Sequence, residues 1–288
     1  MKAIRLLLAT LLVCGSFQAH AQYGGGMGCD YYGMCDEPRV YTGLWWNPAE
    51  SGWGLNTTHQ GNVLFATLFT YAVDGQPLWL VASNLIGIGE NTFSGLLFHT
   101  HGPPFNQVPW SPIGFDQVGT MMIAWDTAET AMVSYTMNGV SVTKRVQQQV
   151  FGPVPTCMSV MGSRAGEANY QDLWWNPDES GWGINLVQQG ATIFATLFTY
   201  SETGRDKWFV ASSLARQADG SFAGDLYSTT GPAFNAMTWT AIGFAPVGSM
   251  TLRFTDGEHG TLTYNVGTAN VVKPITRQVF GVMTSACR

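Results

Sequence analysis

Tryptophan, glutamate and asparagine side chains recur together at two places in this chain. The phrase LWWNPAESGWG occupies residues 44–54, and LWWNPDESGWG occupies residues 173–183. Indole rings offer faces on which a sugar or an apolar ligand can stack, and neighbouring carboxylates and amides can exchange hydrogen bonds with it. The candidate ligand-binding residues are Trp46, Glu50, Trp53 and Asn56 in the first copy, and Trp175, Glu179, Trp182 and Asn185 in the second.

The same residues also have an architectural explanation. Adjacent residues of a strand point to opposite faces, so Trp45 can fill a core while Trp46 faces solvent, a ligand or another part of the protein. Asn47 and Pro48 open a turn, in which the carboxylate of Glu50 can cap backbone N–H groups. The sequence leaves both interpretations open.

No motif in the sequence assembles a catalytic centre. The chain has no nucleophile-elbow, phosphate-loop or dinucleotide-binding pattern, and nothing brings Glu50 and Glu129 together as an acid–base pair. His99 and His101 are spaced like metal ligands, but the second copy has Ser228-Thr229-Thr230 at those positions. We therefore expect ordinary strand histidines and a protein that is not an enzyme, and we assign no catalytic residue, no metal and no cofactor.

The first residues predict export. Lys2 and Arg5, a short apolar run and an A-x-A site predict a signal peptide over residues 1–21, cleaved after Ala21. An alternative is a lipoprotein acylated at Cys14. About eight apolar residues are too few to cross a bilayer, which needs roughly twenty. We expect a periplasmic or secreted protein with no transmembrane segment in the mature chain.

An exported chain with an even number of cysteines is expected to form disulfides. Four cysteines follow the signal peptide: Cys29, Cys35, Cys157 and Cys287. Either Cys29 and Cys35 attach the head of the chain to the ends of the two copies, or Cys29 pairs with Cys35 and Cys157 with Cys287. A metal site in CDYYGMC is a further alternative, but that stretch lacks a second ligand pair.

Composition indicates an all-β protein without a nucleic-acid partner. The net charge is -6 and the pI about 5.2, whereas a nucleic-acid partner favours a basic face. Only 11% of residues are charged, 13% are aromatic, and 34 are glycine, which is typical of β-strands linked by many turns.

The chain contains two copies of one repeat unit. Residues 41–152 superimpose on residues 170–281 at a constant offset of 129 without a gap, and about 50 of the 112 positions are identical. The predicted organisation is a signal peptide (1–21), a Cys-, Gly- and Tyr-rich head (22–40), a first barrel (41–152), a linker (153–169), a second barrel (170–281) and a C-terminal tail containing Cys287 (282–288).

Within each copy the apolar residues alternate with period two, and turn pairs such as Asp74-Gly75 separate the runs. The pattern predicts about eight strands per copy in an antiparallel meander, which closes into a small up-and-down barrel because closure removes exposed edges. A β-sandwich is the alternative. The turn-rich stretches 102–119 and 231–248 are expected to act as lids, as contact surfaces, or as plugs that fill a barrel end with their own aromatics.

The string WWNP-x-ESGWG, followed by FATLFTY, TGP and a closing QVFG, resembles a repeat found in exported proteobacterial proteins. The resemblance covers residues 41–152 and 170–281. It implies an exported β-domain, and it brings no established activity and no catalytic residues.

Three functions fit these observations. The leading hypothesis is an exported, non-catalytic binding module with two equivalent aromatic sites for a cell-envelope or extracellular glycan. The second is a structural or protein-interaction role in the envelope, as an assembly factor or a protease inhibitor. The third is an apolar-ligand carrier, which requires that Phe65, Phe69, Trp79 and Phe93 do not fill the barrel interior.

Overall fold

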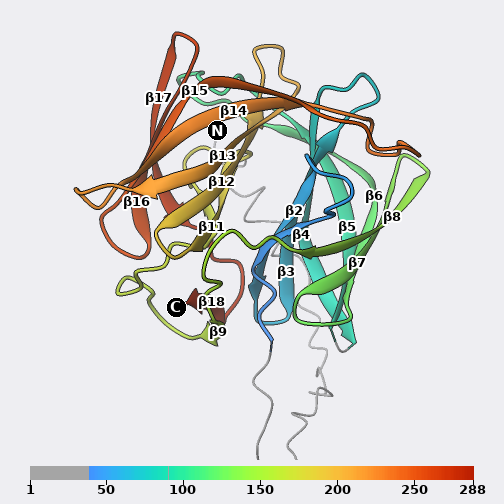
Figure 1. The fold of residues 1–288 in the computed structure, drawn as a ribbon, viewed down its shortest axis with the longest axis horizontal. Helices are drawn as coiled ribbons and strands as arrows, with labels where there is room; N and C mark the ends of the chain where they lie inside the picture. Colours follow the sequence, from blue (N-terminus) through green and yellow to red (C-terminus); the bar gives the residue numbers. More distant parts are fainter. Residues whose placement is uncertain (1–38, 90) are drawn as a thin grey trace, which may run out of the picture.

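The alternating sequence closes into two eight-stranded antiparallel barrels in the computed structural model, which describes residues 39–89 and 91–288. Figure 1 shows the barrels side by side, the first blue to green and the second yellow to red. The first barrel contains β1 (Gly43–Trp46), β2 (Gly54–Gln60), β3 (Val63–Tyr71), β4 (Pro77–Gly89), β5 (Thr92–His101), β6 (Gly114–Trp125), β7 (Thr130–Met137) and β8 (Val140–Gln148). The second contains β10 (Asp172–Trp175), β11 (Gly183–Gln189), β12 (Thr192–Tyr200), β13 (Asp206–Arg216), β14 (Phe222–Thr230), β15 (Gly243–Phe254), β16 (His259–Val266) and β17 (Ala269–Arg277).

Closure confirms the predicted barrel and excludes the sandwich. Strands follow one another around each barrel in sequence order, and β1 pairs with both β2 and β8. Matching strands begin 129 residues apart, as at Gly43 of β1 and Asp172 of β10. No helix in the described ranges is long and apolar enough to span a membrane. The predicted signal peptide, Cys14, Cys29 and Cys35 lie outside the described residues.

The interior of each barrel is filled by aliphatic side chains and a few aromatic rings. In β3 the inward residues Leu64, Ala66 and Leu68 are fully buried in the core of the first barrel. Phe65 and Phe69 occupy the opposite face of that strand, and Trp79 also lies outside the interior. Of the four aromatic residues considered as filling for the barrel, Phe93 alone packs in its core. The other three belong to a third aromatic cluster, which lies between the barrels.

That third cluster joins the two barrels through matching residues. Phe69, Tyr71 and Trp79 of the first barrel pack with the corresponding Phe198, Tyr200 and Trp208 of the second. The indole N–H of Trp79 donates to the Thr199 carbonyl at 3.0 Å, and that of Trp208 donates to the Thr70 carbonyl at 3.1 Å. Because each contact is repeated with the roles of the barrels exchanged, the barrels are related by a local twofold arrangement.

A pair of glutamines extends this reciprocal interface. The side-chain oxygen of Gln60 accepts hydrogen bonds from the backbone N–H groups of Phe280 and Gly281 in the closing QVFG of the second copy. Gln189 does the same for Phe151 and Gly152 of the first copy. These contacts explain why the glutamine and the QVFG sequence occur in both copies.

The two long loops are exchanged between the barrels. Phe105, which follows β5, packs inside the second barrel near Phe209 and Tyr264. Phe234, which follows β14, packs inside the first barrel near Tyr135. The loops therefore act as plugs, but each fills the neighbouring barrel rather than its own. They are also shorter than expected, because β6 begins at Gly114 and β15 at Gly243.

The segments predicted as a linker and a tail pair with each other. Part of the linker forms β9 (Cys157–Val160), part of the tail forms β18 (Thr284–Cys287), and the two make an antiparallel sheet. A disulfide joins Cys157 to Cys287. This excludes attachment of the head cysteines to those two positions, and the disulfide is compatible with an oxidising compartment.

Candidate functional site

The glutamate of the duplicated phrase holds an internal network in the first barrel. Glu50 accepts a hydrogen bond from the Trp53 indole N–H at 3.1 Å and from the Lys144 ammonium at 2.7 Å. The exchanged loop completes the network, since Lys144 lies 5.8 Å from the ring centre of Trp239 and the Trp239 indole N–H donates to the Ser51 carbonyl at 2.9 Å. Glu50 is therefore engaged within the protein.

The second barrel repeats the network with the first copy's loop. Glu179 accepts a hydrogen bond from the Trp182 indole N–H at 3.1 Å and forms an ion pair with Lys273. The Lys273 ammonium lies 4.9 Å from the ring centre of Trp110, whose indole N–H donates to the Ser180 carbonyl at 2.9 Å. At each barrel end, the duplicated phrase thus forms the surface on which the exchanged loop of the other copy packs.

A glycine of the phrase shows how closely the loop approaches. Gly52 has a φ of +107°, which L side chains rarely adopt, and a Cβ atom there would lie 2.5 Å from a side-chain carbon of Ile242. Gly181 meets Ile113 in the same way at the other barrel. The short, glycine-containing turn is required by contact with the loop of the neighbouring barrel.

The remaining candidate residues divide between buried and half-buried positions. Asn56 and Asn185 are buried, as are Trp53 and Trp182, while Trp46 is half-buried. The Trp46 indole nitrogen and the Asn56 side-chain oxygen are buried without a hydrogen-bond partner among the described residues. The structure brings Trp53 and Glu50 into direct contact but gives no exposed platform formed by all four residues.

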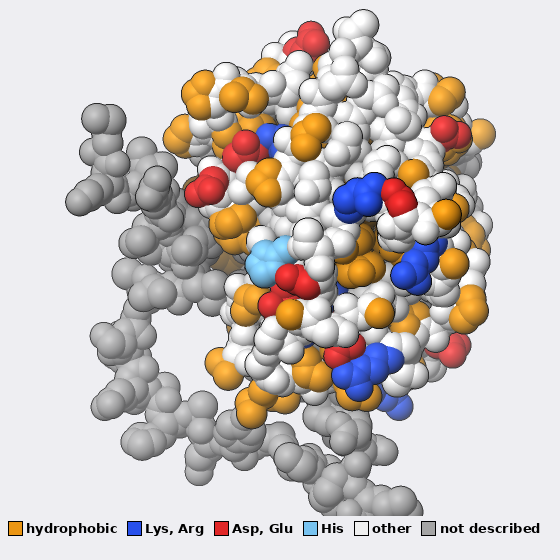
Figure 2. Space-filling view, turned by 90° about the vertical axis from the view of Figure 1, so that its left-hand side faces the viewer, with side chains coloured by type: hydrophobic (Ala, Val, Ile, Leu, Met, Phe, Trp, Pro, Cys, Tyr) orange, Lys and Arg blue, Asp and Glu red, His pale blue; other side chains and the backbone are white. Residues whose placement is uncertain are grey.

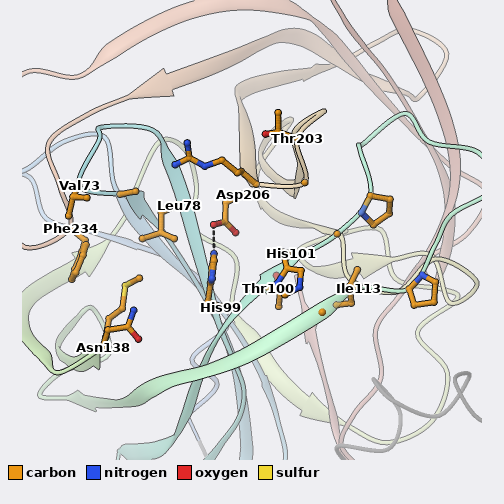
Figure 3. Close-up of a pocket in the computed structure, with 18 of the residues that line it drawn as sticks. Val73, Leu78, His99, Thr100, His101, Ile113, Asn138, Thr203, Asp206 and Phe234 are labelled. Carbon is orange, nitrogen blue, oxygen red and sulfur yellow. Dashed lines mark hydrogen bonds and ion pairs between the residues drawn. The ribbon is translucent and has the colours of Figure 1, made fainter.

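A cleft of about 1030 Å³ opens where the rim of the first barrel meets the second. In Figure 3, Val73, Leu78 and Phe234 lie on one side of the cleft, and His101, Thr100 and Ile113 lie on the other. Phe234, which plugs the first barrel, is part of the lining. Its further apolar lining comes from Ala72, Pro103, Pro112, Met137 and Val140, and its uncharged polar lining includes Ser111, Asn138, Thr203 and Asn235.

A histidine–aspartate pair joins the two barrels in this cleft. Nε2 of His99, at the end of β5, lies 2.5 Å from Oδ2 of Asp206, the first residue of β13 (Figure 3). The side chain of Asp206 is 8% exposed and that of His99 33% exposed. The Asp206 carboxylate raises the pKa of His99 by accepting its hydrogen bond, and burial opposes this effect. Burial also raises the pKa of the Asp206 carboxyl, and the hydrogen bond and charge of His99 oppose that rise.

The pair breaks the equivalence of the barrels. The position of His99 in the second barrel is Ser228, and that of Asp206 in the first is Pro77. Ser228 instead accepts a hydrogen bond from the Lys207 ammonium at 2.7 Å. The cleft at the first barrel thus carries groups that the matching position does not. The sequence comparison found the His99 difference but not its partner, because only the fold places Asp206 beside it. The aligned copies did contain a signal, because residues 205–208 of the second copy read RDKW where residues 76–79 of the first copy read QPLW, so Asp206 stands opposite a proline.

Four titratable side chains line the cleft. They are His99, His101, Arg205 and Asp206. Asp206 pairs with His99, and the Arg205 guanidinium pairs with Asp74 at 2.7 Å on the rim. Figure 2, which shows another face, has acidic and basic side chains interspersed. Within the described residues, no group of three His, Cys, Asp or Glu side chains is placed to hold a metal ion.

Comparison with known proteins adds no assignment: no family model, curated protein or solved structure matches the chain.

Proposed function

We propose that this chain is an exported, non-catalytic binding protein, and that its ligand is a glycan segment held in the cleft between the barrels. The observation that supports the proposal is the cleft itself, which both barrels build and which combines apolar walls with hydroxyl, amide and imidazole groups. Such a mixed lining suits a sugar, whose C–H faces pack on apolar side chains while its hydroxyls form hydrogen bonds. A volume of about 1030 Å³ accommodates a short oligosaccharide.

This proposal moves the binding surface away from the duplicated phrase. Glu50 and Glu179 are engaged by indole and ammonium groups of the protein, and Trp53 and Trp182 are buried. A ligand at those residues would have to displace the exchanged loops. A carrier function also has little support, because core clusters and the two plug residues occupy the barrel interiors.

The test is retention of residues 22–288, with the disulfide formed, on peptidoglycan, chitin and cellulose and on soluble oligosaccharides. Val73→Trp should abolish retention, since Val73 lines the cleft from a hairpin where it is 81% exposed and a larger ring is tolerated. Val282→Trp introduces the same ring at another valine, which is 91% exposed and is not among the residues that line the cleft, and should leave retention intact.

Two results would refute the cleft as the glycan site. One is unchanged retention by Val73→Trp together with loss in the double variant Trp46→Ala/Trp175→Ala, which would return the site to the duplicated phrase. The other is no retention of the unaltered protein on any glycan.

A protein-interaction role is the second candidate, and a pair of exposed aromatic contacts favours it. Phe244 is 52% exposed and stacks on Tyr227, with ring centres 4.2 Å apart. The matching residues Phe98 and Phe115 of the first barrel lie 6.1 Å apart. Exposed aromatic pairs on the surface of a barrel are suited to contact another protein. Capture of one defined envelope protein that Phe244→Ala abolishes would favour this function.

A further inference from the structure

The exposed side of His99 determines what the cleft can recognise. Its Nε2 is occupied by Asp206, so an imidazolium at this position has Nδ1–H as its second donor. No described residue accepts a hydrogen bond from Nδ1, and the ring lines the cleft. His99 therefore presents a charged donor to a ligand, while the carboxylate that stabilises its charge is buried behind it.

We propose that the cleft selects a carboxylate-bearing saccharide and that His99 holds its carboxylate, at one site per chain. The inference rests on the proposed glycan function and specifies the ligand of that site. A charged donor binds a charged acceptor more strongly than a neutral one, and the Arg205 guanidinium, which pairs with Asp74, also lies in the lining. A chain of net charge -6 would otherwise repel an acidic sugar.

Apart from Asp206, the acidic groups near the cleft lie outside its lining. Asp116 is 3.9 Å from His101, and Asp74 pairs with Arg205, so both carboxylates stand at the exposed rim. Of the charged groups that face His99, Asp206 and Asp116 raise its pKa, and His101 and Arg205 lie beside it in the lining. Binding should therefore be strongest at a pH where His99 is protonated and weaken as the pH rises through its pKa.

One site per chain follows from the difference between the barrels. The matching position has Ser228 in place of His99 and Thr230 in place of His101. Neither hydroxyl carries charge, and Lys207 is already bonded to Ser228. The acidic ligand should thus bind with a stoichiometry of one, although the chain has two barrels.

The experiment compares trigalacturonate with its methyl ester, which has the same rings but no negative charge. Titration calorimetry at pH 6 should give about tenfold or more tighter binding for the acid, as expected for a charge-assisted hydrogen bond. NMR titration of the imidazole signals should show that trigalacturonate raises the pKa of His99. Affinity for the acid should decline as the pH rises above 6.5 and through the raised pKa of His99.

Matched variants separate recognition from folding. His99→Ser installs the residue that the second barrel carries, and unchanged binding of the ester would show that the variant is folded. It should reduce affinity for the acid about tenfold. His259→Ser removes an exposed histidine paired with Asp256 outside the cleft and should change neither affinity.

The outcomes also distinguish this inference from the proposed function. Equal binding of acid and ester, with both lost in Val73→Trp, would overturn the carboxylate assignment and leave the glycan cleft standing. Retention of neutral glycans alone would have the same meaning. Failure of the protein to bind trigalacturonate, its ester and every other glycan would overturn both.

Discussion

Two residues at matching positions show how different side chains can serve one backbone contact. Nδ1 of His59 accepts a hydrogen bond from the Tyr41 backbone N–H at 3.3 Å, and the side-chain oxygen of Gln188 accepts one from the Tyr170 N–H at 2.9 Å. The imidazole differs from the amide in that it titrates. Burial lowers the pKa of His59 from 6.5 to about 4.

We predict that His59→Gln reduces the acid sensitivity of the fold. The folded state keeps His59 neutral while the unfolded chain binds a proton below pH 6.5, so the free energy of unfolding falls as the pH drops from 6.5 towards 4. The difference between these pKa values corresponds to roughly 3 kcal/mol lost by pH 4. Urea unfolding at pH 7, 5.5 and 4 measures it.

The direction of the effect separates His59 from His99. The raised pKa of His99 contributes stability that is present below pH 6.5 and is lost as the pH rises through the folded value. His99→Ser should therefore remove the loss of stability that the raised pKa of His99 causes above pH 6.5. If His59→Gln loses as much stability on acidification as the unaltered protein, burial of His59 is not the cause.

At the scale of elements, the exchanged loops connect the stability of each barrel to its neighbour. Phe234 is 7% exposed and fills the end of the first barrel, although it follows a strand of the second. The loop also carries Trp239, which reaches Ser51 and stands over Lys144. One short loop thus fills a core and completes an ion-pair network of the other barrel.

We predict that Phe234→Ala destabilises the full chain by about 3–5 kcal/mol, because it leaves a cavity in a packed core. Met237→Ala in the same loop is the control, since Met237 is fully exposed, and should change stability by less than about 0.5 kcal/mol. Urea unfolding measures the loss, and amide hydrogen exchange locates it. Loss of protection confined to the strands of the second barrel would contradict the exchange of plugs.

At the scale of the whole molecule, the chain resembles a dimer joined into one polypeptide. Trp79 and its counterpart Trp208 each donate to a backbone carbonyl of the other copy, and so do Gln60 and its counterpart Gln189. The loops are exchanged in both directions. In such a twofold arrangement, one interface lets the same residues of both copies make the same contacts. The His99–Asp206 pair is a departure from that equivalence.

We predict that residues 39–152, expressed alone, form a homodimer. The isolated barrel lacks Phe234, but Phe105 of a second copy is the same residue type at the matching position and can fill the open end. Light scattering after size exclusion should give twice the monomer mass. Phe105→Ala should weaken the dimer, and a folded monomer with a fully protected core would show that the plug is dispensable. In this dimer Pro77 replaces Asp206, so the acidic ligand should bind weakly.

The sequence by itself determined the strands and their approximate number, because alternation and turn residues are local properties. Only the tertiary structure decided that the strands close into barrels rather than form a sandwich, because closure depends on pairing between the first and last strands. The offset of 129 likewise located the matching strands without any structure. Tertiary structure decided which face of β3 is the core, since Phe65 and Leu64 are both apolar and alternate in a strand apolar on both faces. It also decided that the duplicated phrase receives a loop, and that Asp206 lies beside His99. Trp110 and Ser180 are 70 positions apart, His99 and Asp206 are 107 apart, and Trp239 and Ser51 are 188 apart, so only the packing of one barrel against the other sets these distances.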